Sequence, residues 1–214
     1  MTRLIAWFVE CWRRLRHQLV HGLINEYSGE LPPAREDEMP LPWGARSIWR
    51  HPDFPIEPPS GNLKIDRGAG DRKEPGFLGL DISPRFAPDI QCDLTNGIPL
   101  ADDTVGHILA RHILEHLPDL IFIMNELYRV CANGALVQID VPHVDSAMAV
   151  ADPTHRRYFS EESFHYFCLN GRHTRLNEAY GIHCRFDLMA EEIFRHRRNG
   201  YIKVTLTARK EGHA

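Results

Sequence analysis

Two short apolar runs, each ended by an aspartate and separated by glycines, constrain the fold of this chain most strongly. The first run ends in the motif Asp66-Arg-Gly-Ala-Gly70, and the second, Phe77–Leu80, ends in Asp81. This order predicts a strand, a glycine loop, a second strand and an acid. In open α/β sheets, nucleotide-like ligands bind beyond the strand ends, where glycine permits close approach and a carboxylate accepts hydrogen bonds from ribose. Glycines between strands are more often simple turns, so the motif needs support from the rest of the chain.

Length and charge set the broad class of the protein. The chain has 214 residues, which predicts one domain with additions and a sizeable core. Its formal charge of −4 argues against a nucleic-acid-binding footprint over the whole surface. We therefore predict no nucleic-acid partner.

Cysteine usage indicates a reducing compartment and no metal site. The five cysteines are odd in number and never form a Cys-x-x-Cys pair, which argues against a disulfide framework and favours the cytoplasm. One cluster late in the chain contains two cysteines and two histidines, but its spacing fits no zinc pattern. We interpret its members as buried thiols and surface histidines: Cys168, His173, His183 and Cys184.

The first 61 residues are expected to lie apart from the main domain. Residues 3–27 carry apolar residues at helical spacing among arginines, which predicts a helix packed on the domain or on a partner chain. The alternative is a basic helix at a membrane surface, which would make a cytoplasmic protein peripheral to the membrane. Residues 31–61 are rich in proline and predict an arm without regular structure. We place the domain boundary between 1–61 and 62–214.

The pattern from residue 62 onward predicts an α/β fold. A helix is expected at 118–132, with Pro118 at its start and Gly134 past its end, and another at 160–169. The pair Asn199-Gly200 predicts a final hairpin. We expect a mostly parallel sheet with an antiparallel C-terminal hairpin, built from strands at 62–66, 77–82, 88–93, 105–111, 135–142, 184–195 and 200–209.

Three further polar segments follow predicted strands. Asp93 comes after the third strand, where it either accepts from an exocyclic amine or forms an Asx turn. Residues 108–119 run from a strand into a histidine-rich corner, at the sheet edge where α/β enzymes place their chemistry. Residues 152–159 follow the strand that ends near His143. They are dense in hydrogen-bonding groups, although helix capping and surface charge also explain such a run.

Together these segments resemble the class I S-adenosylmethionine-dependent methyltransferases, from Asn62 to about Phe167. The small branch often found near polysaccharide biosynthesis is most similar. The resemblance implies a Rossmann-like three-layer sandwich. The matching elements, in order, are Asp66-x-Gly68-Ala69-Gly70, Asp81, Asp93 with Pro99-Leu100, Leu114-Glu115-His116-Leu117, Glu126-Leu127-Tyr128-Arg129-Val130 and Asp152-Pro153-Thr154-His155-Arg156.

The resemblance also implies roles for individual residues. The loop Gly68–Gly70 would cradle the methionine part of the cofactor, Asp81 would hold the ribose and Asp93 would face the adenine amine. The acceptor would be a small molecule or glycan, methylated at oxygen. The implied cofactor-binding residues are Asp66, Gly68, Ala69, Gly70, Asp81, Ile82, Asp93, Leu94, Arg111 and His112. The implied catalytic histidines are His112, His143 and His155, and the implied substrate-binding residues are His143, Asp152, His155 and Arg156.

The chain departs from the family pattern in several places. Arg67 stands where the family has an apolar strand residue, and a charge there must escape burial or find a partner. Arg72 replaces a frequent third glycine, and Asn133-Gly134 replaces a Pro-Gly-Gly turn. A second hypothesis is therefore a degenerate methyltransferase fold that serves as a scaffold, with Arg67 blocking the pocket. A nicotinamide oxidoreductase fits less well, since Asp81 comes too early for its fingerprint.

Overall fold

The computed structural model describes residues 46–50, 52, 59, 62–68, 70, 73–173 and 177–210. All of these belong to one compact unit, Leu41–Ala214. The expected helix at 3–27, most of the expected arm at 31–61, and the loop residues Ala69 and Arg72 lie outside the described residues.

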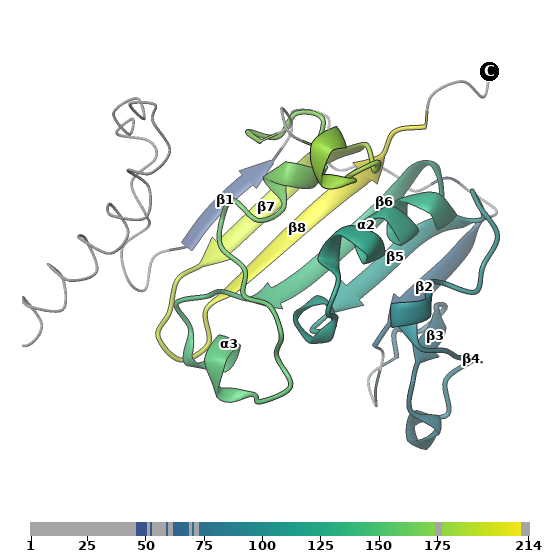
Figure 1. Ribbon diagram of the computed structural model, residues 1–214, viewed down its shortest axis with the longest axis horizontal. Helices are drawn as coiled ribbons and strands as arrows, with labels where there is room; N and C mark the ends of the chain where they lie inside the picture. Colours follow the sequence, from purple (N-terminus) through teal and green to yellow (C-terminus); the bar gives the residue numbers. More distant parts are fainter. Residues whose placement is uncertain are drawn as a thin grey trace, which may run out of the picture. The chain divides into compact units, whose positions relative to one another are not determined.

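A single eight-stranded sheet forms the centre of this unit, with the order β1-β7-β8-β6-β5-β2-β3-β4 (Figure 1). Strands β2 to β6 run parallel to one another, whereas β8 is antiparallel to both β6 and β7. The predicted mostly parallel sheet with an antiparallel end is thus confirmed. The strands are β1 (Arg46–Arg50), β2 (Leu63–Arg67), β3 (Leu78–Asp81), β4 (Ile90–Gln91), β5 (Val105–Arg111), β6 (Cys131–Pro142), β7 (Phe186–Phe194) and β8 (Tyr201–Ala208).

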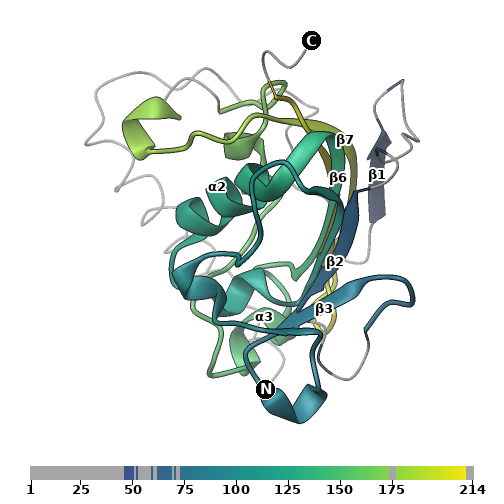
Figure 2. The ribbon, with the colours of Figure 1, turned by 90° about the vertical axis from the view of Figure 1, so that its right-hand side faces the viewer.

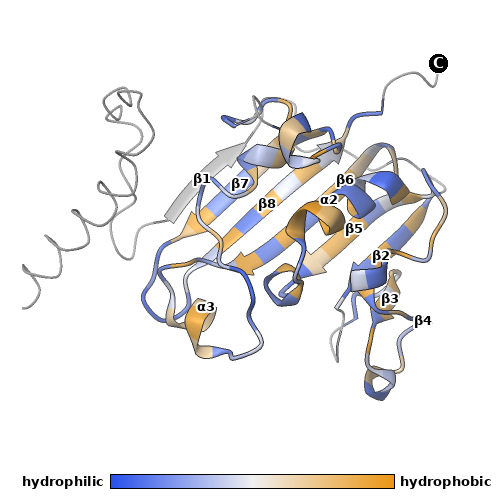
Figure 3. Ribbon diagram, viewed as in Figure 1, coloured by the Kyte–Doolittle hydropathy of each residue, from blue (hydrophilic) through white to orange (hydrophobic). Residues whose placement is uncertain are grey.

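Helix α2 (Leu120–Val130) covers the middle of one face of the sheet (Figure 2). The side chain of Asp119 caps it by accepting a hydrogen bond from the Phe122 amide, which accounts for the start near Pro118. Apolar residues at helical spacing along α2 belong to the same buried core cluster as residues of β5 and β6. Figure 3 shows apolar and polar residues alternating along this helix. No described helix covers the opposite face, so the described residues supply one helical layer of the predicted sandwich. The buried residues of α2 are Ile123, Met124, Leu127 and Val130.

The remaining helical segments are short. Helix α3 (Ala147–Ala151) was not predicted; the Ser146 side chain caps it. The predicted helix at 160–169 is wrong, because this segment forms turns that bury Phe164 and Phe167 in the core, with one 3₁₀ turn. The 3₁₀ turns are η2 (Pro84–Phe86), η3 (Leu94–Asn96), η4 (Leu114–His116), η5 (His165–Phe167) and η7 (Glu178–Tyr180). No helix among the described residues is long and apolar enough to cross a membrane.

Two strand features correct the sequence analysis. Strand β1 forms inside the proline-rich arm, where Arg46–Arg50 contains no proline and pairs with β7. The final hairpin has a longer connection than a two-residue Asn-Gly turn, because β7 ends at Phe194 and β8 begins at Tyr201. Gly200 is needed there for space, since a Cβ would lie 2.8 Å from the carbonyl oxygen of Phe194.

Candidate functional site

The carboxyl ends of the parallel strands gather most of the predicted site residues at one edge of the sheet. Asp81 ends β3, Asp93 follows β4, and His112 follows β5. Asp140 lies near the end of β6. These residues belong to different strands, and the parallel topology brings them to the same edge.

The glycine loop after β2 has the geometry that only glycine tolerates well. Gly68 and Gly70 have φ values of +64° and +50°. A Cβ on Gly68 would lie 2.9 Å from the side chain of Ile113. The Gly68 amide donates to the Leu80 carbonyl at 2.9 Å, and the Gly70 amide donates to the Asp81 carboxylate at 3.2 Å. Gly68 and Gly70 are therefore both held against β3, and neither carries a side chain that would keep a ligand at a distance.

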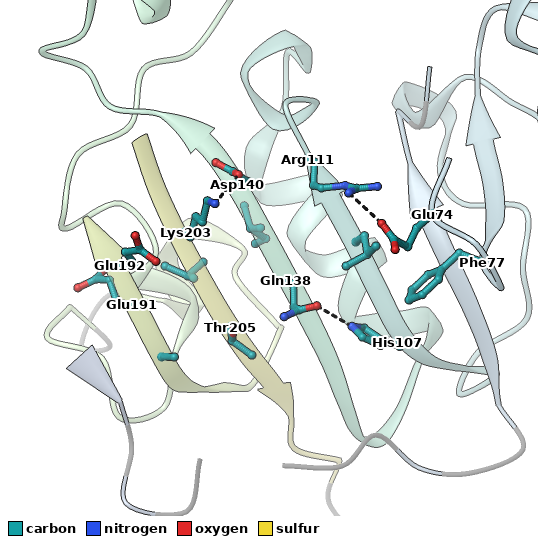
Figure 4. Close-up of a pocket in the computed structure, with 14 residues that line it drawn as sticks. Glu74, Phe77, His107, Arg111, Gln138, Asp140, Glu191, Glu192, Lys203 and Thr205 are labelled. Carbon is teal, nitrogen blue, oxygen red and sulfur yellow. Dashed lines mark hydrogen bonds and ion pairs between the residues drawn. The ribbon is translucent and has the colours of Figure 1, made fainter. Parts of the chain in front are cut away.

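Asp66, two residues before this loop, pairs with Arg111 at the end of β5. Asp66 is 1% exposed, and one of its oxygens accepts from Arg111 at 2.7 Å and from the Glu74 amide at 2.9 Å. Arg111 also pairs with the Glu74 carboxylate at 3.2 Å. Figure 4 shows Arg111 directed toward Glu74 across the sheet face opposite α2, where a cavity of about 500 Å³ opens. Asp66 and Arg111, two of the residues predicted to bind the cofactor, thus contact other protein groups. Arg111 also lines the cavity on this face of the sheet.

Asp81 holds its carboxylate against Gly70, and Asp93 follows β4 further along the same edge of the sheet. Asp81 accepts from the Ser83 amide at 2.8 Å, and the neighbouring Ile82 exposes 62% of its surface. Asp93 accepts from the amide and hydroxyl of Thr95, which hold the pKa of Asp93 below its usual value. The Asx-turn interpretation of Asp93 is therefore confirmed. Leu94, by contrast, is buried in the core.

Next to Asp93 a second cavity, of about 420 Å³, opens toward α2. Its lining contains Asp93, Cys92, Phe122 and Glu126. The adenine-facing position that the resemblance implies for Asp93 therefore has space beside it.

A third cavity lies beyond the ends of β5 and β6 and has a volume of about 440 Å³. We call it the acceptor cavity because the resemblance implies substrate-binding residues there. It brings together three predicted residues, His112, Asp152 and His155. Sequence reasoning assigned no role to the others, although Glu115 and His116 stand in the histidine-rich corner. The remaining lining residues are Glu115, His116, Asp140, Pro142, Met148, Asn199, Gly200, Tyr201 and Lys203.

His112 occupies a strained position at the mouth of this cavity. Its φ is +51°, and its amide donates to the Asp140 carbonyl at 2.8 Å, which holds the backbone in this conformation. Its ring is 61% exposed, and Nδ1 lies 3.4 Å from the Glu115 carboxylate. The nearby Glu115 carboxylate raises the pKa of His112. Burial raises the pKa of Asp140, which lies 3.5 Å from the Lys203 ammonium group.

The loop 152–157 folds back onto the turn η4 and closes one side of the acceptor cavity. The amides of Arg156 and Arg157 both donate to the Glu115 carbonyl, at 2.8 and 3.2 Å. Asp152 accepts from the amide and the hydroxyl of Thr154. Arg156 itself is exposed and does not line the cavity, so its predicted contact with substrate has no support there.

His143, predicted as a base and a substrate contact, is withdrawn from the acceptor cavity. It is 1% exposed and absent from the cavity lining. Its Nδ1 accepts from the Asp145 amide at 3.1 Å, and its Nε2 lies 3.3 Å from Glu161. These contacts point to a structural role.

The late cysteines and histidines are separate structural elements. Cys168 and Cys184 are buried, and burial raises the pKa of Cys184 to about 12. His173 pairs with Glu162 at 2.9 Å, and His183 is exposed. The interpretation of buried thiols is confirmed.

Arg67 lies fully buried on the face of β2 opposite Asp66. It is 0% exposed, and no described residue accepts a hydrogen bond from any of its three guanidinium nitrogens. Burial lowers its pKa to about 10, while nearby Glu126 acts in the opposite direction. The group is thus charged at neutral pH. Among the described residues, Arg67 lines none of the three cavities, so it does not block them.

Comparison with known proteins gives a family match for part of the chain. Residues 71–139 match the family model of a methyltransferase domain. This match covers about a third of the chain, and over these residues the protein is similar to a methyltransferase domain. The match begins just after the glycine loop and ends just before Asp140. No curated protein matches the sequence.

Several solved structures are similar to this chain. A methyltransferase from Archaeoglobus fulgidus has 14% identity and a TM-score of 0.48 over 69% of this chain and 86% of its own. A Haloferax volcanii methyltransferase, solved in complex with the Trm112 methyltransferase activator, has 17% identity and a TM-score of 0.48 over 75% and 86%. The 1,6-didemethyltoxoflavin-N1-methyltransferase of Burkholderia thailandensis, with bound S-adenosylhomocysteine, has 15% identity and a TM-score of 0.44 over 69% and 71%.

Proposed function

We propose that this protein is a methyltransferase that transfers a methyl group to a hydroxyl oxygen of a polar acceptor, a small molecule or a glycan. One observation carries the proposal. A fixed glycine loop with two carboxylates and a polar cavity with an exposed histidine lie along the same carboxyl edge of the sheet. The first part suits the cofactor and the second suits an acceptor.

The residues of the glycine loop fit S-adenosylmethionine. The bare backbone at Gly68 and Gly70 suits its methionine part, and the carboxylates of Asp81 and Asp93 suit its ribose hydroxyls and adenine amine. When bound, the cofactor supplies a methyl group on a sulfonium, whose positive charge disappears on transfer. Asp81 already accepts from Gly70 and Ser83, but each carboxylate oxygen can accept more than one hydrogen bond.

On the acceptor side, His112 is the candidate proton acceptor by position. Of the three predicted catalytic histidines it has the most exposed ring, and it stands at the cavity mouth on the strand end nearest the glycine loop. Methyl transfer mainly requires alignment of the nucleophile and exclusion of water. His112 would take the proton that the acceptor hydroxyl loses as its oxygen forms the new bond to carbon.

The cavity lining indicates what an acceptor should carry. Asp152, Tyr201 and Lys203 offer polar groups suited to hydroxyls and to an anionic substituent. Beside them lies Met148, which also lines the cavity and is 57% exposed. This exposed apolar side chain supports an acceptor with an apolar portion, such as a lipid-linked glycan.

A screen for turnover tests this proposal. The natural chain would be incubated with S-adenosylmethionine and a panel of sugars, anionic sugars and lipid-linked glycans, and S-adenosylhomocysteine would be measured. We expect release with at least one polar acceptor and none from Asp81→Ala at the same cofactor concentration. Cofactor binding without turnover on any acceptor would favour the scaffold hypothesis.

A further inference from the structure

Three groups that commonly bind metals meet in the wall of the acceptor cavity. Glu115 and His116 come from turn η4, and His155 comes from the loop 152–157. One ligand atom of each lies within 4.8 Å of the others. We propose that these three residues bind a divalent transition metal ion of the Zn²⁺ type. Spacing along the chain gives no sign of this site, because the three residues are spread over 41 positions.

The Glu115 carboxylate is the first sign of such a site, because its one described ion-pair contact, with His112, is long. Its side chain is 2% exposed, and no described residue donates a hydrogen bond to either oxygen with acceptable geometry. His112 Nδ1 approaches one oxygen only to 3.4 Å. An ionised carboxylate withdrawn from water needs donors or a cation to offset the lost hydration. A metal ion bound at Glu115 would supply that compensation.

The hydrogen bonds of His155 leave one ring nitrogen able to bind a metal. Its Nδ1 lies 2.7 Å from the carbonyl oxygen of Ala149, which can only accept. Nδ1 must therefore carry a proton, and Nε2, which lies 3.9 Å from a carboxylate oxygen of Asp152, is the ring nitrogen that a metal ion would bind. A backbone carbonyl in this position is the partner that orients many metal-binding histidines.

A chain of hydrogen bonds assigns the same tautomer to His116. The Thr154 hydroxyl lies 2.6 Å from Asp152 Oδ1, and its single proton goes to that carboxylate. The same hydroxyl lies 2.9 Å from His116 Nδ1, so it accepts there from a protonated Nδ1. Nε2 of His116 is thus the nitrogen with the free lone pair. Two neighbouring imidazoles are each held in the form that binds metals.

The ligand set indicates the type of metal and its use. Two imidazole nitrogens and one carboxylate form a ligand set found in zinc enzymes, in which a fourth position stays open to water or substrate. All three residues line the acceptor cavity together with His112. A bound ion would hold an acceptor hydroxyl and lower its pKa. That use rests on the proposed methyl transfer, whereas metal binding does not.

Titration with ZnCl₂ tests the site. The full chain, freed of metal by dialysis against chelator, would be titrated calorimetrically alongside His116→Gln, His155→Gln and the matched control His183→Gln, which removes an exposed histidine elsewhere. We expect one equivalent of Zn²⁺, bound at least 10-fold more weakly by the first two variants and unchanged in the control. Thr154→Val, which breaks the chain that orients His116, should weaken binding roughly 10-fold or more.

Co²⁺ loaded into the natural chain gives a readout that needs no variant. Its electronic and paramagnetic resonance spectra should report histidine nitrogen ligation. The metal site would be overturned by any of three results. Zn²⁺ does not bind stoichiometrically, or its affinity falls no more in His116→Gln and His155→Gln than in the control, or the Co²⁺ spectrum shows no nitrogen ligands. S-adenosylmethionine affinity measured in chelator separates the two proposals. If Zn²⁺ fails to bind but S-adenosylmethionine still binds in chelator, the metal site is wrong and the proposed methyl transfer still stands.

Discussion

The two halves of the sheet's carboxyl edge are built in different ways. The cofactor half, at the ends of β2 to β4, is assembled from neighbours in the chain, such as Gly70 and Asp81, 11 residues apart. The acceptor half, at the ends of β5 and β6, joins distant segments, such as His116 and Thr154, 38 residues apart. The cofactor half can therefore be recognised as a motif, whereas the acceptor half exists only once the chain has folded. If the halves have separate roles, substitutions in each should affect different measurements.

His155→Ala should produce the largest effect, on turnover alone. The variant removes a group from the acceptor cavity, and we expect turnover to fall by roughly 10²–10⁴-fold, as for a lost acid, base or metal ligand. Cofactor affinity should stay almost unchanged, and His183→Ala serves as the control. Joint loss of cofactor affinity and thermal stability would show that the loop 152–157 only holds the fold. The two halves would then not have separate roles.

Asp81→Ala should produce the opposite pattern. Loss of a charge-assisted pair of hydrogen bonds to ribose costs on the order of 2–4 kcal/mol of cofactor binding free energy. Calorimetric titration with S-adenosylmethionine measures this directly. Asp89→Ala, a carboxylate that pairs with Lys73 away from the strand end, is the matched control. Equal affinities in Asp81→Ala and the natural protein would reject the assignment.

Arg67→Met tests whether the buried arginine lowers cofactor affinity or turnover. Because the guanidinium is fully buried without a hydrogen-bond acceptor among the described residues, an apolar side chain of similar length should raise the free energy of unfolding by about 1–4 kcal/mol. Urea denaturation measures the change. Cofactor affinity and turnover should be retained. A large gain in cofactor affinity would instead revive the hypothesis that Arg67 blocks the pocket.

Glu191, which belongs to neither half, should make the stability of the fold depend on pH. Burial raises its pKa to about 7, against 4.5 for an ordinary glutamate. Between these two pKa values the folded protein keeps a proton that the unfolded chain has lost. The contribution of Glu191 to the free energy of unfolding therefore falls as pH rises from about 4.5 to 7. Glu191→Gln should remove a decline of about 1–3 kcal/mol between pH 5 and 8.

Comparing the pH dependence of stability in Glu191→Gln and in the natural protein separates the effect of Glu191 from that of His165, which has the opposite sign. His165 Nε2 lies 3.8 Å away, and burial lowers the pKa of His165, which gives the opposite slope in both proteins. Denaturation curves at several pH values, with turnover measured in parallel, check this. Identical pH profiles of stability would contradict the assignment.

Sequence reasoning reached the parts of the fold that depend on local pattern. The apolar runs ending at Asp66 and Asp81 became β2 and β3, and the amphipathic run after Pro118 became α2. The start signal at Ser160 failed, because Phe164 and Phe167 are held in the core by a chain that turns. Tertiary packing overrode a local preference there.

The acceptor half shows the same limit. Spacing could not reveal that His143 is buried while His116 and His155 meet, since both facts depend on how the loop 152–157 docks on η4. Nor could it show that Arg111 turns away to Asp66 and Glu74, because that contact requires the strand pairing of β2 with β5.

A calorimetric titration of the natural chain with S-adenosylmethionine is the decisive experiment, because the proposed methyl transfer depends on cofactor binding at the ends of β2 to β4. The account predicts saturable binding of one equivalent, retained in His155→Ala and weakened in Asp81→Ala. No detectable binding to the folded natural chain, or binding that His155→Ala weakens as much as Asp81→Ala does, would contradict it.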